Sequence, residues 1–150
     1  MSTIAALALL LCAGCFENRE APYRPVTARS LDEAITNQAA VERVILAKQN
    51  LSGFPRELAS MPKLTVLELR GTQGLGTLEG LADLKALKQL DLSATQMETV
   101  PDAVFALAGL ERLYLSDNKI KELPAAIGNL TALSYLNLDV NQLGALPPEL

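Results

Sequence analysis

One recurring spacing of leucines constrains most of this chain. Leucine or another apolar residue recurs as L-x-x-L-x-L, then come a polar position and a second apolar series. Copies of this pattern start at residues 41, 64, 87, 110 and 133, which is a period of 23 residues. A fixed period of this length is typical of a solenoid, in which each unit buries its apolar edge only against its neighbours. We therefore expect about five stacked coils over residues 41–150, the last of them incomplete.

The first half of each copy predicts a short β-strand with one buried face. In the fourth copy, Leu110, Leu113 and Leu115 are separated by more polar residues, and such alternation is the pattern of a half-buried strand. A polar residue follows three positions after the last leucine of the run. Its side chain can hydrogen-bond backbone groups at a tight bend. This structural ladder is predicted to contain, in chain order, Gln49, Thr72, Thr95, Asn118 and Asn141.

The second half of each copy predicts a short helical or 3₁₀ segment. In the fourth copy Leu123, Pro124, Ile127 and Leu130 follow the pattern L-P-x-x-L-x-x-L. The three-residue spacing suits a helical turn, and proline is favoured at its start because its missing N–H has no partner there. Each coil should thus contain one strand and one helical turn.

The second copy departs from this pattern. Leu75 and Leu78 stand one position late, and the proline is absent. We expect Gly71, Gly74 and Gly76 to absorb a local bulge, because glycine adopts backbone angles that other residues avoid. A harmless irregularity of the convex side and a functional kink are both open interpretations.

These residues together resemble the leucine-rich repeat family over residues 41 to 150. The run Leu123, Pro124, Ile127, Gly128 and Leu130 is similar to the 23-residue subtype found in Ras-group scaffold proteins and common in bacteria. The resemblance implies an α/β solenoid with a parallel β-sheet on the concave face and short helical or 3₁₀ segments on the convex face. It implies a fold and not a Ras partner.

The segment before the repeats predicts a linker followed by an N-terminal cap. Residues 15–29 have no apolar periodicity and mixed charge, which is the composition of a flexible linker. Over residues 30–40, Ser30 and Glu33 form a capping-box pattern, and Leu31, Ala34 and Ile35 share one helical face. We interpret this helix as the cover of the solenoid's first end; a partner-binding helix is the alternative.

The fifth copy stops at Leu150 without a polar cap. Its predicted strand, residues 135–139, would present unpaired backbone groups at the edge of the sheet. Further sequence, a partner protein or self-association through this edge would each cover it.

The N-terminus has the features of an export signal. Residues 3–14 are almost wholly apolar, too few to span a bilayer but suited to a signal peptide over residues 1–14. The run Leu11-Cys12-Ala13-Gly14-Cys15 resembles the lipobox of bacterial lipoproteins, although Cys12 stands where leucine is usual and no Lys or Arg precedes it. The resemblance implies lipid attachment at Cys15 and a place in the bacterial cell envelope. Phe16 implies delivery to the outer membrane, facing the periplasm or the surface; an ordinary secretory signal or an apolar N-terminal helix is the alternative.

Composition argues against catalysis and nucleic-acid binding. The chain has no histidine, and no cysteine follows Cys15, so the usual metal sites and nucleophile–base pairs cannot form in the mature domain. Net charge is −4 and the basic residues are scattered rather than clustered in a stripe. We expect no enzymatic activity, no cofactor and no bound metal.

The strand register predicts which side chains line the concave face. Residues between the leucines point away from the core. Five strands about 4.8 Å apart make a wall roughly 20 Å wide. Tyr114, Tyr135 and Arg112 should form a cluster there; tyrosine and arginine are enriched at binding hot spots, although tyrosine also simply favours β structure. The candidate partner-binding residues are Arg43, Ile45, Val66, Glu68, Arg70, Gln89, Asp91, Arg112, Tyr114, Tyr135, Asn137 and Asp139.

These features together predict a non-catalytic interaction module. The leading hypothesis is a lipid-anchored envelope protein that binds a protein or peptide on its concave face. The alternatives are a structural or glycan-contacting envelope lipoprotein, and the N-terminal part of a longer protein whose activity lies downstream.

Overall fold

The computed structural model describes residues 23–150. The predicted signal peptide and Cys15 lie outside these residues. Within residues 23–150 no helix combines the length and the apolar character needed to cross a bilayer.

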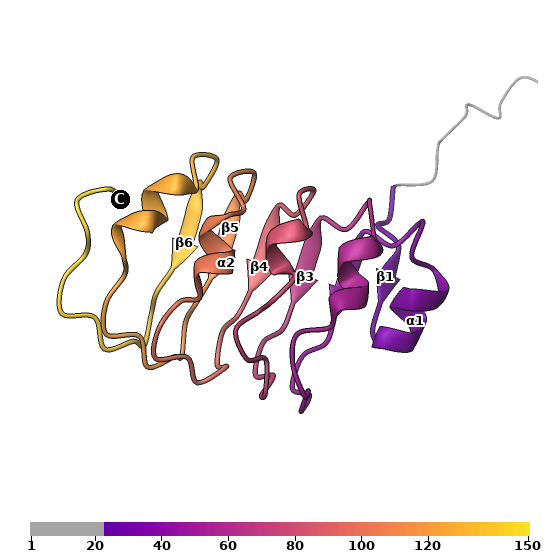
Figure 1. The fold of residues 1–150 in the computed structure, drawn as a ribbon, viewed down its shortest axis with the longest axis horizontal. Helices are drawn as coiled ribbons and strands as arrows, with labels where there is room; N and C mark the ends of the chain where they lie inside the picture. Colours follow the sequence, from indigo (N-terminus) through magenta and orange to yellow (C-terminus); the bar gives the residue numbers. More distant parts are fainter. Residues whose placement is uncertain (1–22) are drawn as a thin grey trace, which may run out of the picture.

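A parallel sheet of six strands runs through the described chain in sequence order (Figure 1). Equivalent residues of neighbouring coils pair in register, as Val44 does with Leu67 and Leu67 with Leu90. The parallel sheet and the stacking of one coil on the next confirm the predicted solenoid. The strands are β1 (Thr27–Ala28), β2 (Arg43–Ile45), β3 (Val66–Glu68), β4 (Gln89–Asp91), β5 (Arg112–Tyr114) and β6 (Tyr135–Asn137).

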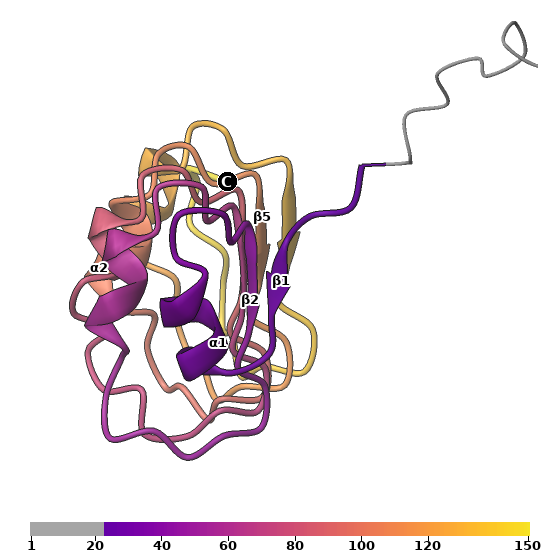
Figure 2. The same ribbon diagram turned by 90° about the vertical axis from the view of Figure 1, so that its right-hand side faces the viewer.

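Short helical segments form the opposite layer, as the view along the solenoid shows (Figure 2). They are α1 (Leu31–Thr36), η1 (Arg56–Ser60), η2 (Leu81–Asp83), α2 (Asp102–Phe105) and η3 (Ala125–Asn129), where η marks a 3₁₀ turn. Pro55, Pro101 and Pro124 stand directly before η1, α2 and η3, as the sequence predicts. Before η2, where proline is missing, Gly80 adopts a left-handed conformation with φ 92°. The starts of η1, η2, α2 and η3 are thus set by a residue with restricted or unusual backbone angles.

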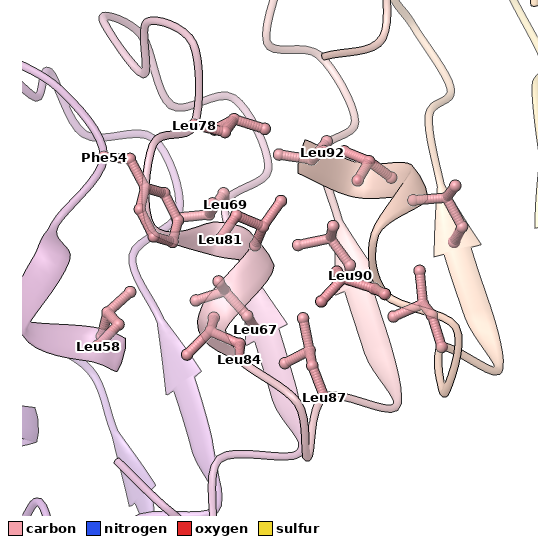
Figure 3. Close-up of a cluster of buried hydrophobic side chains, with 14 of the residues drawn as sticks. Phe54, Leu58, Leu67, Leu69, Leu78, Leu81, Leu84, Leu87, Leu90 and Leu92 are labelled. Carbon is pink, nitrogen blue, oxygen red and sulfur yellow. The ribbon is translucent and has the colours of Figure 1, made fainter. Parts of the chain in front are cut away.

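The core lies between the two layers and consists mainly of leucine. Leu67 and Leu90 point inward from the sheet and meet Leu58 and Leu81 from the convex side (Figure 3). All four side chains are fully buried. Phe105, which stands outside the leucine register, is only 4% exposed and covers the core. Each coil therefore contributes one apolar layer that only its neighbours can cover.

The capping helix α1 begins as its sequence predicts. The hydroxyl of Ser30 accepts the N–H of Glu33 at 3.1 Å, and the Glu33 carboxylate accepts the N–H of Arg29 at 2.8 Å. Ala34 is fully buried, but Ile35 is 41% exposed, so its predicted place on the buried face is wrong. Successive helical residues are about 100° apart, so a contact centred on Ala34 turns Ile35 away from it.

The predicted linker over residues 15–29 ends earlier than expected. Thr27 and Ala28 form β1 and pair with Arg43 and Val44, so the sheet of the described residues has six strands rather than five. The open edge of β2 offers unpaired backbone groups, and the preceding chain supplies their partners. Two residues are too few to show a periodic pattern, which is why the sequence gives no sign of this strand.

One position in every coil adopts a left-handed backbone. It lies two residues after the third leucine and comprises Lys48, Gly71, Ala94, Asp117 and Val140, with φ between 54° and 70°. Gly71 therefore belongs to a feature that all coils share. Gly74 and Gly76 lie in the irregular stretch and also have positive φ, 74° and 63°. At Gly74 the reason is close packing, since an added Cβ would lie 1.9 Å from the carbonyl oxygen of Leu51.

Candidate functional site: the concave face

The strands place the predicted concave residues in two parallel rows. The first row consists of Arg43, Val66, Gln89, Arg112 and Tyr135, which pair in register. The second row lies two residues further along each strand and consists of Ile45, Glu68, Asp91, Tyr114 and Asn137. The first row contains two arginines and no acid, whereas the second contains two acids and no base.

In the N-terminal half, a diagonal ion pair joins the two rows. Arg43 Nε lies 3.5 Å from Glu68 Oε1, and both side chains are about one-third exposed. Ile45 and Val66 are half-buried beside them. The charges of Arg43 and Glu68 are therefore paired with each other, although Arg43 Nε makes no hydrogen bond.

A second ion pair lies past the C-terminal ends of the strands and joins residues that are two coils apart. Arg70 lies 3.4 Å from Asp117, whose place in the left-handed turn brings its side chain toward the wall. Beneath this pair Ser93 and Ser116 are buried, and the Ser116 hydroxyl donates to that of Ser93 at 3.2 Å. Sequence reasoning placed Arg70 on the wall but missed Asp117, because the partners are 47 residues apart and no local pattern links them.

The C-terminal half contains the aromatic cluster. The rings of Tyr114 and Tyr135 have centroids 5.1 Å apart and are tilted by 42°. Tyr135 is 46% exposed, and Arg112 pairs with it in register. Arg112 is itself exposed, and no acidic side chain lies within ion-pair distance of it among residues 23–150.

Two of the remaining polar side chains of the wall accept hydrogen bonds from backbone N–H groups. The Asp91 carboxylate accepts the N–H of Ser93 at 2.8 Å, and the Asn137 side-chain oxygen accepts the N–H of Asp139 at 2.9 Å. Asp139 is exposed at the C-terminal corner. The wall is thus partly pre-ordered by its own hydrogen bonds.

Four of the five ladder residues bind backbone groups inside the solenoid through their side chains. Asn118 accepts the N–H groups of Thr95 and Met97 and donates to the carbonyls of Leu92 and Leu115, at 2.9–3.1 Å. Each of these bonds closes a bend or joins adjacent coils. Gln49, by contrast, takes part through its backbone N–H, which approaches Thr72 Oγ1 at 3.5 Å. The other members form similar side-chain bonds: Thr72 to the Leu46 carbonyl, Thr95 to the Leu92 carbonyl, and Asn141 to the Leu115 and Leu138 carbonyls.

Other features of the described residues are weaker candidates for a functional site. Residues 23–150 contain no group of three or more side chains suited to holding a metal ion. A hollow of about 530 Å³ lies between Leu31 of α1 and the loops at residues 51–57 and 75–79. None of its lining residues belongs to the two rows. The concave face therefore remains the best candidate site.

Comparisons with known proteins agree with this architecture. The sequence model of the leucine-rich repeat region family matches residues 41–149. A leucine-rich repeat protein of Leptospira interrogans has 26% identity and a TM-score of 0.66, over 84% of this chain and 38% of its own. Internalin C2 of Listeria monocytogenes has 29% identity and a TM-score of 0.64, over 80% of this chain and 50% of its own. A TDR receptor has 26% identity and a TM-score of 0.63, over 85% of this chain and 23% of its own.

The chain thus spans half or less of the length of these solved structures. No curated protein matches it. The repeat that matches the family model also builds the sheet and the core described above. On these grounds the chain belongs to the leucine-rich repeat family.

Proposed function

We propose that this chain is a non-catalytic binding module that recognises a protein or peptide on its concave face. Leucine-rich repeat domains are typically interaction modules, which supports the general class. The observation that carries the proposal is the cluster of Tyr114, Tyr135 and Arg112 on an open sheet. Large, stiff aromatic side chains and arginine dominate the binding energy of many interfaces.

Photo-crosslinking tests the assignment of the face. A photoreactive amino acid at position 135 should yield a discrete adduct in the native envelope. The same group at position 106, which is exposed on the convex side, should not. Adducts of equal yield at both positions would refute the concave site.

Paired substitutions test the residues. Tyr114→Ala with Tyr135→Ala should weaken binding of the captured partner by about 2 kcal/mol or more, roughly thirtyfold in Kd. Tyr23→Ala, an exposed tyrosine at the other end of the chain, is the matched control and should leave Kd unchanged. Unchanged binding in the double variant would remove the tyrosines from the site.

We further propose that a lipid on Cys15 anchors the module in the bacterial envelope through two or more acyl chains. The proposal rests on the lipobox-like sequence before Cys15. Each buried methylene adds about 0.8 kcal/mol, so two acyl chains make a stable anchor. Metabolic labelling with a fatty acid should mark the wild type and Cys12→Ser but not Cys15→Ser. Label that persists in Cys15→Ser would rule out this attachment site.

A further inference from the structure

The two first-row arginines of the concave face have different neighbours on the next strand. Arg43 in β2 meets Glu68, which stands in the second row on the next strand. Arg112 in β5 occupies the same place relative to its own next strand, where the second-row residue is Asn137. The position that holds a carboxylate for Arg43 thus holds an uncharged amide for Arg112.

The surroundings of Arg112 do not supply a carboxylate from elsewhere. Its neighbours in the first row are Gln89 and Tyr135, both uncharged. Asp91 lies diagonally across in β4, but it is not within ion-pair distance, and its carboxylate accepts the Ser93 N–H. The oxygen of Asn137 is likewise engaged by the Asp139 N–H. The guanidinium of Arg112 therefore has free donors on an open face.

An aromatic surface adjoins this free cation. Tyr114 packs on one side of Tyr135 with tilted rings, which leaves part of Tyr135 exposed beside Arg112. When one residue of a ligand binds Arg112, the next residue of that ligand lies over the exposed ring of Tyr135. Flat or apolar groups bury well against such a surface.

From this arrangement we infer that the C-terminal half of the wall binds an acidic peptide segment. A Glu or Asp side chain of the ligand forms an ion pair with Arg112, as Glu68 does with Arg43. An adjacent aromatic or proline residue packs on Tyr135. The inference rests on the proposed function and names the chemistry of its partner. Carboxylates are favoured because guanidinium donors bind them in a planar, bidentate manner.

A panning experiment tests this chemistry directly. The full chain, immobilised in mild detergent, is exposed to a displayed library of random linear peptides. Enriched sequences are expected to carry Glu or Asp next to an aromatic residue or proline. Replacing that acid by its amide in a synthetic copy should weaken binding at least tenfold.

Two variants that add the same charge at different positions provide the sharpest comparison. Asn137→Glu places a carboxylate where Glu68 stands relative to Arg43 and should occupy Arg112 internally, with at least a tenfold loss of peptide affinity. Asn129→Glu adds the same charge at an exposed position of η3, outside the two rows, and should stay within twofold of wild type. Arg112→Gln should match the loss in Asn137→Glu, and circular dichroism establishes that each variant is folded.

The outcomes separate this inference from the proposed function. Enriched peptides without acids, which bind through Tyr114 and Tyr135, would overturn the acidic partner and leave the binding module standing. Capture of isolated glycan strands in place of peptides would also overturn it. No enrichment on the folded chain would overturn the acidic peptide, whereas the proposed function falls only if the crosslink from position 135 fails as well.

Discussion

At the scale of single residues, Asn118 shows how one side chain joins two coils. It is only 6% exposed and binds backbone groups of both its own coil and the preceding one. Its position was predictable because the amide recurs at a fixed distance after the leucines. The sequence did not predict that Asn118 forms more hydrogen bonds than Gln49. The number of bonds depends on the backbone bends that surround each ladder position.

Replacing Asn118 should therefore destabilise the fold. Asn118→Ala leaves buried N–H and C=O groups without partners, and each such group costs about 1–3 kcal/mol. We expect a loss of about 3 kcal/mol in the free energy of unfolding, measured by urea denaturation. Asn129→Ala, at an exposed position in η3, should change it by less than about 0.5 kcal/mol. Equal effects would contradict the structural role of the ladder.

Gly74 and Gly76 form a second matched pair. Both have positive φ, but only at Gly74 does an added Cβ collide with backbone, the Leu51 carbonyl oxygen. Gly76→Ala should cost about 1 kcal/mol from its left-handed backbone, and Gly74→Ala about 3 kcal/mol or more because packing must also shift. Thermal unfolding of the two variants measures the difference. A smaller loss in Gly74→Ala would show that the two loops separate easily.

At the scale of elements, α1 and β1 together close the first end of the solenoid. The cap formed by Ser30 and Glu33 was predictable from the sequence, because capping depends on neighbours within one helical turn. The strand β1 was not, because its two residues pair with β2 more than ten positions later. Local chemistry predicts a helix start, whereas strand pairing depends on which edge is free.

The cap of α1 gives a prediction at this scale. Ser30→Ala removes the acceptor for the Glu33 N–H and should lower stability by about 1 kcal/mol. Hydrogen exchange should quicken first at the amides of Ala34 and Asn37, which lie in α1 and at its end. Ser52→Ala, an exposed loop serine, is the control and should leave these amides protected. Unchanged exchange in Ser30→Ala would mean that packing alone holds the helix.

At the scale of the whole molecule, burial falls off toward the last coil. Leu113 is fully buried, whereas Leu136 at the equivalent place is only partly so, and Leu146 is 61% exposed. β6 is paired on one side only within the described residues. The last coil should therefore contribute less to the free energy of unfolding than the coils before it.

Two matched leucine substitutions measure this gradient. Leu113→Ala should lower the free energy of unfolding by about 3 kcal/mol, and Leu136→Ala by about half as much or less, because Leu136 is only partly buried. Urea denaturation of the two variants checks the difference. Equal losses would contradict a weaker last coil.

The sequence by itself determined the repeating parts of this protein. The leucine period set the strands, the inward residues and the helical turns, because each depends on spacing within one coil or on contact with an identical neighbour. The tertiary structure decided what arises between coils that are not identical. It paired Arg70 with Asp117 across two coils, buried Ser93 beneath them, and left Arg112 without an ion-pair partner diagonally across from Asn137. These contacts depend on how side chains from different copies meet, and no spacing within a single copy encodes them.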